Sequence, residues 1–259
     1  MRTITLLSAS LAILATQLHA GAIITFPFEA NTPGDLNGQS GFTADTAVDV
    51  VAGGLSYTAG SVSSPGGSQN ILIGQEATNN AGTSAAFSNT FTSQSGAVYF
   101  SVAMEWSGIS TDFLYFALSD DTDIASLTNS AGFLLGSGGD ELRGRIRENS
   151  STNTTTTKLA DVATTTTGTQ FVVGKLWKDG STNYNTLDLW LNPTSNVEGS
   201  AGGTTLQIVR DMGVSFVDSL YLRGDATGIG ASASVEMDNI LLGTTFSDVV
   251  PVPEPSTYA

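Results

Sequence analysis

The side chains that could perform chemistry in this sequence are almost all carboxylates. The chain has no cysteine and a single histidine, His19, against 24 aspartate and glutamate residues. Catalytic triads of the usual kind need a histidine base, and most zinc sites need histidine or cysteine ligands. Carboxylate chemistry therefore remains. Glu236 and Asp238 are the clearest pair for it, because residues two apart on a strand point to the same face.

The N-terminal residues have the three-part layout of a secretory signal peptide. A short basic start precedes the apolar stretch 4–14, and small residues follow. The apolar stretch is too short to span a bilayer. We predict that residues 1–20 are the signal peptide, with cleavage at their end or after Ala22, and the alternative is a buried N-terminal strand or helix. Either cleavage removes His19 from the exported chain.

Alternation of apolar and polar residues predicts strands along the body of the chain. The clearest case is Ala97 to Trp106, where every second residue is apolar. The same pattern predicts five more strands and, more weakly, another five: 112–118, 171–177, 186–191, 215–222 and 235–242, then 47–51, 70–73, 85–91, 132–135 and 142–147. Residues 21–249 are therefore predicted to form one all-β domain, a two-sheet antiparallel β-sandwich of the jelly-roll type.

Composition restricts the partners of this domain. The 24 acidic and 9 basic side chains give a net charge of −15. A field of that sign repels nucleic acid and anionic membrane surfaces, so neither is an expected partner. Without cysteine no disulfide supports the fold, but a domain of this length buries enough surface to manage without one.

The last ten residues, 250–259, form a proline-rich tail that cannot join a sheet or a helix. Together with the export signal, the motif Pro253, Glu254 and Pro255 resembles the start of a PEP-CTERM sorting signal, in which it precedes a transmembrane helix and a basic cluster. That anchor helix is missing from this sequence, and we expect the full-length gene to encode it. An ordinary Pro-rich linker is the alternative.

The resemblance to PEP-CTERM proteins has further implications. These proteins are exported by Gram-negative bacteria that make exopolysaccharide, and a membrane transpeptidase called exosortase processes the tag. The expected partner is thus an exosortase-type enzyme, the expected location is the cell surface or the extracellular space, and membrane contact would be made only through the missing anchor. Four segments resemble strands and turns of a group of these proteins with concanavalin A-like or laminin-G-like jelly rolls: 28–42, 171–177, 187–193 and 237–249.

Retaining glucanases with this sandwich fold carry the pattern Glu-x-Asp-x-x-Glu on one strand. Glu236 and Asp238 match its first two positions, but Leu241 occupies the third. A retaining mechanism needs both an acid and a nucleophile. We therefore interpret the match as coincidental and predict no catalytic residues.

Calcium is the one cofactor that the resemblance implies. Many jelly rolls hold a structural ion where the first and last strands meet, which here would bring Glu29 near Asp238. Asn239 and backbone carbonyls would supply further oxygen ligands. The alternative is that these side chains are solvated or cap turns.

Glycan binding would need exposed aromatic rings beside polar groups. Trp106 and Trp177 share the phase of the apolar residues in their strands, which predicts burial. Trp190 lies out of phase with its leucine neighbours and is the tryptophan expected on a binding surface, with Tyr184 as a companion.

Two functions follow as hypotheses. The first is a non-catalytic exported surface or extracellular matrix protein, glycan-binding or associated with extracellular polysaccharide. The alternative is a divergent polysaccharide hydrolase or lyase that depends on carboxylates.

Overall fold

The computed structural model describes the following residues: 22–26, 28–44, 48–74, 86–109, 114–121, 128–136, 141–149, 153–224 and 234–252. Within them the regular secondary structure is almost entirely β-strand, and every strand pair is antiparallel. The predicted signal peptide and the motif Pro253, Glu254 and Pro255 lie outside the described residues.

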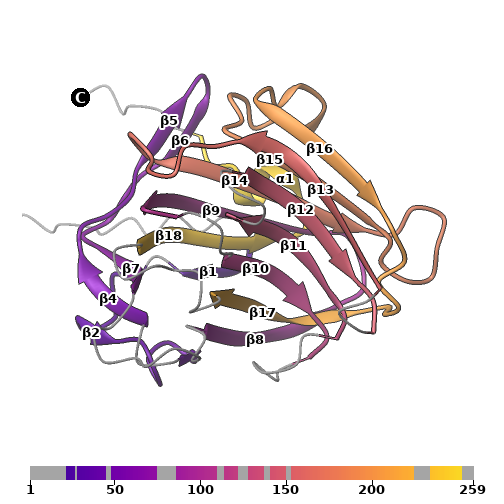
Figure 1. Ribbon diagram of the computed structural model, residues 1–259, viewed down its shortest axis with the longest axis horizontal. Helices are drawn as coiled ribbons and strands as arrows, with labels where there is room; N and C mark the ends of the chain where they lie inside the picture. Colours follow the sequence, from indigo (N-terminus) through magenta and orange to yellow (C-terminus); the bar gives the residue numbers. More distant parts are fainter. Residues whose placement is uncertain are drawn as a thin grey trace, which may run out of the picture.

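Two sheets stack face to face (Figure 1). Sheet A has the order β16-β15-β14-β9-β18-β7-β4-β2, and β1 also pairs with β18. Its strands are β1 (Ala22–Phe26), β2 (Gly34–Asp35), β4 (Val48–Ala52), β7 (Gln69–Gly74), β9 (Val98–Ser107), β14 (Gln170–Trp177), β15 (Thr186–Leu191), β16 (Thr204–Val209) and β18 (Ser234–Gly243).

Sheet B has the order β13-β12-β11-β10-β17-β8-β3, and its strands run side by side in Figure 1. They are β3 (Thr43–Ala44), β8 (Ala86–Gln94), β10 (Leu114–Ser119), β11 (Ser130–Leu135), β12 (Glu141–Arg147), β13 (Thr154–Asp161) and β17 (Val217–Gly224). A separate hairpin is formed by β5 (Tyr57–Ala59) and β6 (Val62–Ser64). The remaining elements are η1 (Glu198–Ser200) and α1 (Phe246–Val249).

The core lies between the sheets and is built from every second residue of each strand. Phe100 of β9 meets Phe116 and Phe133 of sheet B, with ring centroids 5.1 to 6.4 Å apart. Gly174 faces Phe100, since a Cβ at that position would come within 2.0 Å of the phenyl ring. Burial of these alternating apolar faces is the main force that joins the two sheets.

The outer side of sheet A is covered in its middle. The β5–β6 hairpin and α1 pack against residues of β9, β14, β15 and β18 that point away from the core, and together they form a second apolar cluster. Its largest members are Leu55, Tyr57, Val62, Tyr99, Phe171, Val173, Trp190, Leu241, Phe246 and Val249. We call this surface the covered face.

The sandwich prediction and its eleven strands are confirmed. Each predicted strand corresponds to an observed one, with ends displaced by at most three residues. The alternation patterns did not mark β1, the two-residue strands β2 and β3, the β5–β6 hairpin, or the edge strands β13 and β16. In the part of the chain that is described, no helix has the length and apolar character needed to cross a bilayer.

Candidate functional site

Glu29 fixes the segment that leads from the β5–β6 hairpin into β7. Its Oε1 accepts hydrogen bonds from the backbone N–H groups of Ser68 (2.7 Å) and Gln69 (3.1 Å), and its Oε2 accepts one from the Ser68 hydroxyl (2.6 Å). Burial alone would raise the pKa of Glu29, but these hydrogen bonds outweigh it and lower the pKa below its ordinary value. A Cβ at Gly67 would lie 1.7 Å from Glu29 Oε1, so any larger residue there would displace the Glu29 carboxylate.

The Asp238 carboxylate accepts hydrogen bonds from backbone amides on both sides of the β5–β6 hairpin. Its side chain is 0% exposed. The Leu55 N–H donates to Oδ2 (3.0 Å), the Asn239 N–H donates to Oδ1 (2.7 Å), and the Gly67 N–H also donates to the carboxylate. Burial raises the pKa of Asp238 to about 7 against the lowering effect of these amides, and the charge of Glu29 raises it further.

The three residues expected to bind calcium therefore meet around one segment, but their arrangement does not fit a cation. The oxygens of Glu29 and Asp238 face N–H and O–H donors where a calcium ion would need a shell of six to eight oxygens. Asn239, at φ +50, donates its Nδ2 to the carbonyls of Pro65 (2.7 Å) and Leu55 (3.4 Å). Among the described residues no three acidic or histidine side chains gather to hold a metal.

The expected exposure of Trp190 and Tyr184 is wrong. Trp190 does point away from the core leucines, but it is 8% exposed because Phe246 of α1 packs edge-on against it at 5.1 Å. Tyr184 is 0% exposed, and its hydroxyl donates to the carbonyls of Gln94 (3.0 Å) and Gly96 (2.6 Å). Both rings stabilise the fold and neither offers a surface to a sugar.

The other two tryptophans differ from each other. Trp106 is buried as predicted, and its Nε1 donates to the carbonyl of Ala163 (2.8 Å). Trp177 is only half-buried at the end of β14, where its Nε1 donates to Asp188 (2.7 Å). Lys175 lies 4.8 Å from the Trp177 ring and pairs with Glu198, so the polar groups around this ring are already matched.

The carboxylates of β18 do not form an acid and nucleophile pair. Glu236 is opposite Glu105 of β9 and accepts a hydrogen bond from the Asn70 side chain (2.8 Å). Asp238 lies beneath the β5–β6 hairpin segment, held by backbone amides. Leu241, at the third position of the glucanase pattern, packs in the apolar cluster of the covered face.

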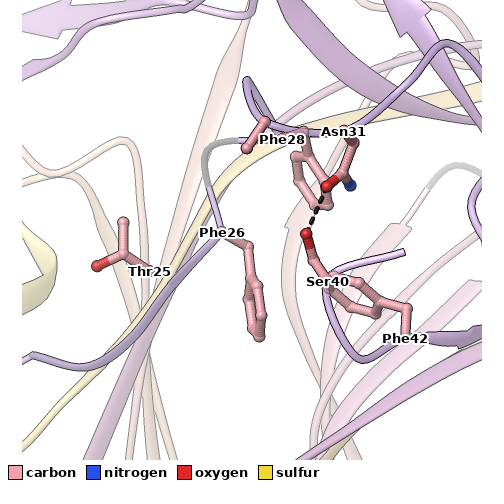
Figure 2. Close-up of a pocket in the computed structure, with 7 residues that line it drawn as sticks. Thr25, Phe26, Phe28, Asn31, Ser40 and Phe42 are labelled. Carbon is pink, nitrogen blue, oxygen red and sulfur yellow. Dashed lines mark hydrogen bonds between the residues drawn. The ribbon is translucent and has the colours of Figure 1, made fainter. Parts of the chain in front are cut away.

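A pocket of about 300 Å³ opens beside the first strand. Figure 2 shows three phenyl rings around it, with the Asn31 side chain accepting a hydrogen bond from the Ser40 hydroxyl. Asn31 Nδ2 is buried and has no hydrogen-bond partner among the described residues. The residues that line the pocket are Thr25, Phe26, Phe28, Ala30, Asn31, Ser40 and Phe42. We call it the phenylalanine pocket.

The outer side of sheet B carries an array of basic side chains. Four of the six arginines in the sequence lie there, three of them at alternate positions of β12. Strand register places Tyr115 between Arg223 and Leu134, and Leu134 next to Arg143. We call this surface the arginine face; its members are Arg143, Arg145, Arg147, Tyr115, Ala117, Ser119, Ser130, Gly132, Leu134, Ser219, Tyr221 and Arg223.

Two guanidinium groups of this face each have one nitrogen atom that is not hydrogen-bonded by the described residues. Among the described residues, neither Arg145 Nε nor Arg147 Nε has a hydrogen-bond partner, although both atoms are buried. The Arg145 guanidinium lies 5.0 Å from the centroid of the Tyr115 ring, a cation–π contact. Burial lowers the pKa of Arg147, and the charges of Arg145 and Arg223 lower it further.

The sequence contained a signal for this face that strand prediction alone did not use. In Glu141–Arg147 every second residue from Arg143 onward is an arginine, and Leu142, Gly144 and Ile146 alternate with them. This pattern predicts a strand with one apolar and one cationic side. Most strands of the chain have uncharged polar residues on their outward side, so three arginines at alternate positions of one strand are unusual.

No protein-family model matches the chain, and a search of curated proteins finds no match either. Solved structures match in fold. A glycosyl hydrolase family 16 protein from Mycobacterium smegmatis is 12% identical, with a TM-score of 0.50 over 86% of this chain and 100% of its own. The carbohydrate-binding module CBM66 from Bacillus subtilis is 11% identical, with a TM-score of 0.43 over 80% of this chain and 97% of its own.

A structure of botulinum neurotoxin type C, whose cell entry depends on two ganglioside molecules, is 13% identical with a TM-score of 0.47. That match covers 88% of this chain, which spans about half (48%) of the toxin chain. At such identities the likeness shows the shared fold alone, a jelly-roll β-sandwich of the concanavalin A type.

Proposed function

We propose that the chain is a non-catalytic glycan-binding protein, exported and retained at the cell surface or in the extracellular matrix. The observation that carries the proposal is the arginine face, where four half-buried arginine side chains gather on one side of a sheet above buried tyrosine and serine residues. Guanidinium groups are donors that bind sugar oxygens and sugar carboxylates. Export and sorting rest on the N-terminal signal and the Pro253, Glu254 and Pro255 motif, with an exosortase-type enzyme as partner.

The experiment is a glycan-array screen with the full chain, in the presence of calcium and again with a chelator. We expect binding to a subset of bacterial polysaccharides, equal in both conditions. An Arg145→Gln variant tests the location, and Arg210→Gln is the matched control because Arg210 lies outside the arginine face and pairs with Glu148. Absence of binding to every polysaccharide on the array would contradict the proposal.

The alternative function, a carboxylate-dependent hydrolase or lyase, has less support. The carboxylates of Glu236 and Asp238 are engaged by an asparagine side chain and by backbone amides, and no third carboxylate accompanies them on β18. Release of sugar from any polysaccharide, lost in Glu236→Gln, would favour the enzyme over the binding protein.

A further inference from the structure

We propose that the arginine face selects an acidic polysaccharide, a chain that carries carboxylate or sulfate groups at regular intervals. The inference rests on the proposed function, glycan binding, and specifies the chemical class of the ligand. It follows from the charge, the spacing and the shape of this face.

The charge of the face is not balanced by its surroundings. In the described part of the chain, Arg143 pairs with Glu141, and Arg210, outside this face, pairs with Glu148. Arg145 and Arg147 form no such pair with any described carboxylate. The neighbours whose charges act on Arg147 are Arg145, Arg223 and two tyrosines.

Such an arrangement is costly in the free protein. Partly desolvated like charges repel each other, and arginine does not escape by losing its proton. A bound anion would relieve the repulsion by pairing with the guanidinium groups. Acidic residues dominate the chain as a whole, 24 against 9 basic ones, whereas four of the six arginines gather on this face.

The spacing favours a polymer over a small anion. Arg143, Arg145 and Arg147 are alternate residues of one strand, so their attachment points are about 7 Å apart along β12. One phosphate or acetate ion could contact two of these groups at most. A chain of acidic sugars that runs along the strand presents a new anionic group to each arginine in turn.

The shape of the face lets the arginine side chains lie across the neighbouring strands. The middle strands carry small residues there, Ala117 and Ser119 on β10 and Ser130 on β11, together with Gly132. Gly132 has no alternative, because a Cβ would come within 1.9 Å of the Phe116 carbonyl oxygen. The Arg145 side chain crosses β11 to reach Tyr115 on β10, so it lies over residues that are themselves buried.

A glycan fits this face better than other polyanions. Nucleic acid carries a much denser charge and is repelled over long range by a protein of net charge −15. Sugars carry hydroxyl and ring oxygens that accept from guanidinium N–H groups between their acidic groups, whereas the tyrosines and serines beneath the arginines are buried. Single-stranded DNA and an acidic polypeptide therefore serve as competing outcomes of the test.

The test measures binding of the full chain to immobilised polygalacturonate, dextran sulfate, neutral dextran, polyglutamate and single-stranded DNA. Each is measured at about 50 mM and about 500 mM NaCl, since screening weakens ionic contacts. We expect the two acidic polysaccharides to bind, with affinity that falls as salt rises. Arg145→Gln and Arg147→Gln should each weaken that binding about tenfold, which is the loss of one charged hydrogen bond, and Arg210→Gln should not.

The outcomes separate the two proposals. Salt-insensitive binding of neutral polysaccharide, unchanged in the Arg145 and Arg147 variants, would overturn the inference and leave glycan binding in place. Polyglutamate or DNA bound as tightly as the acidic polysaccharides would also overturn it. If neither neutral nor acidic polysaccharide bound, the proposed function itself would fail. A stronger response to polygalacturonate than to dextran sulfate would identify carboxylate as the recognised group, and the reverse would identify sulfate.

Discussion

The two outer faces of the sandwich treat their charged groups in opposite ways. On the covered face the Asp238 carboxylate is fully buried, yet backbone amides of three residues donate to it. On the arginine face Arg145 and Arg147 have buried Nε atoms without a partner among the described residues. Buried polar groups in folded proteins are nearly always paired, so the amide donors around Asp238 indicate a structural role, whereas the described residues leave Arg145 and Arg147 incompletely paired.

The comparison also separates aromatic residues by what lies above them. Trp190 has a polar flank in the sequence, but α1 and the β5–β6 hairpin cover it. Tyr115 packs under an arginine side chain in a small cluster with Leu134 and Tyr221. A ring covered by apolar side chains contributes to stability, whereas a ring covered by a cation contributes to a charged surface.

The largest expected effect is the loss of stability in Trp190→Ala. The change removes a large ring from the cluster of the covered face, and large-to-small changes of this kind cost about 3 to 5 kcal/mol. Chemical denaturation measures the loss in free energy of unfolding. Val209→Ala on the adjacent strand is the control, because Val209 is 62% exposed and its truncation should cost less than about 0.5 kcal/mol. Equal stability of the two variants would contradict the covered face.

A pH effect of intermediate size is expected from Asp238. Its pKa is raised to about 7 in the folded protein, so the folded state binds this proton more tightly than the unfolded state. The stabilisation is complete below the unfolded pKa, near 4, and is lost as the pH rises through 7. Its size is on the order of a few kcal/mol.

Asp238→Asn isolates that contribution, since an amide does not titrate. Thermal unfolding at a series of pH values from 4 to 8 should show a smaller decline in the variant than in the parent protein. Parallel curves for the two proteins would mean that Asp238 keeps an ordinary pKa, and that the amide donors have compensated its burial completely.

The arginine face should respond in the opposite sense to mutation. Arg147→Gln removes one member of a group of like charges, so we expect a change in unfolding free energy within about 0.5 kcal/mol, or a small gain. The same variant should lose affinity for acidic polysaccharide. A loss of more than about 2 kcal/mol would show that Arg147 has a structural partner, as Asp238 does.

The smallest expected effect is that of calcium. Ligand binding raises the unfolding temperature in proportion to the logarithm of ligand concentration. Because the oxygens of Glu29 and Asp238 face hydrogen-bond donors, millimolar calcium and an excess of chelator should give the same unfolding temperature. A calcium-dependent rise that is lost in Glu29→Gln would restore the ion site that the sequence suggested.

The limits of sequence prediction follow from the same comparison. Strand periodicity predicted β9, β14, β15 and β18 because their inward residues alternate along the chain. It also placed Trp190 on the correct side of its strand. The cover over Trp190 comes from α1, more than fifty residues later, and from the β5–β6 hairpin, more than a hundred residues earlier, so no local pattern could reveal its burial.

Local sequence patterns could not predict the arginine face for a related reason. Arg145 meets Tyr115 across two strand pairings, and Arg223 joins the face from a strand far along the chain. Only the strand order brings them together. The resemblance to jelly rolls did predict that Glu29 and Asp238 lie near each other, and the first and last strands do pair. The amide donors around the two carboxylates depend on the path of the β5–β6 segment, which the sequence patterns did not predict.

The most direct test of the contrast between the two faces is a crystal structure of the full chain with an oligogalacturonate. We expect sugar carboxylates against the guanidinium groups of Arg145 and Arg147, with the sugar chain running along β12. A sugar bound on the covered face or in the phenylalanine pocket, with the arginine face unoccupied in the same crystal, would contradict it.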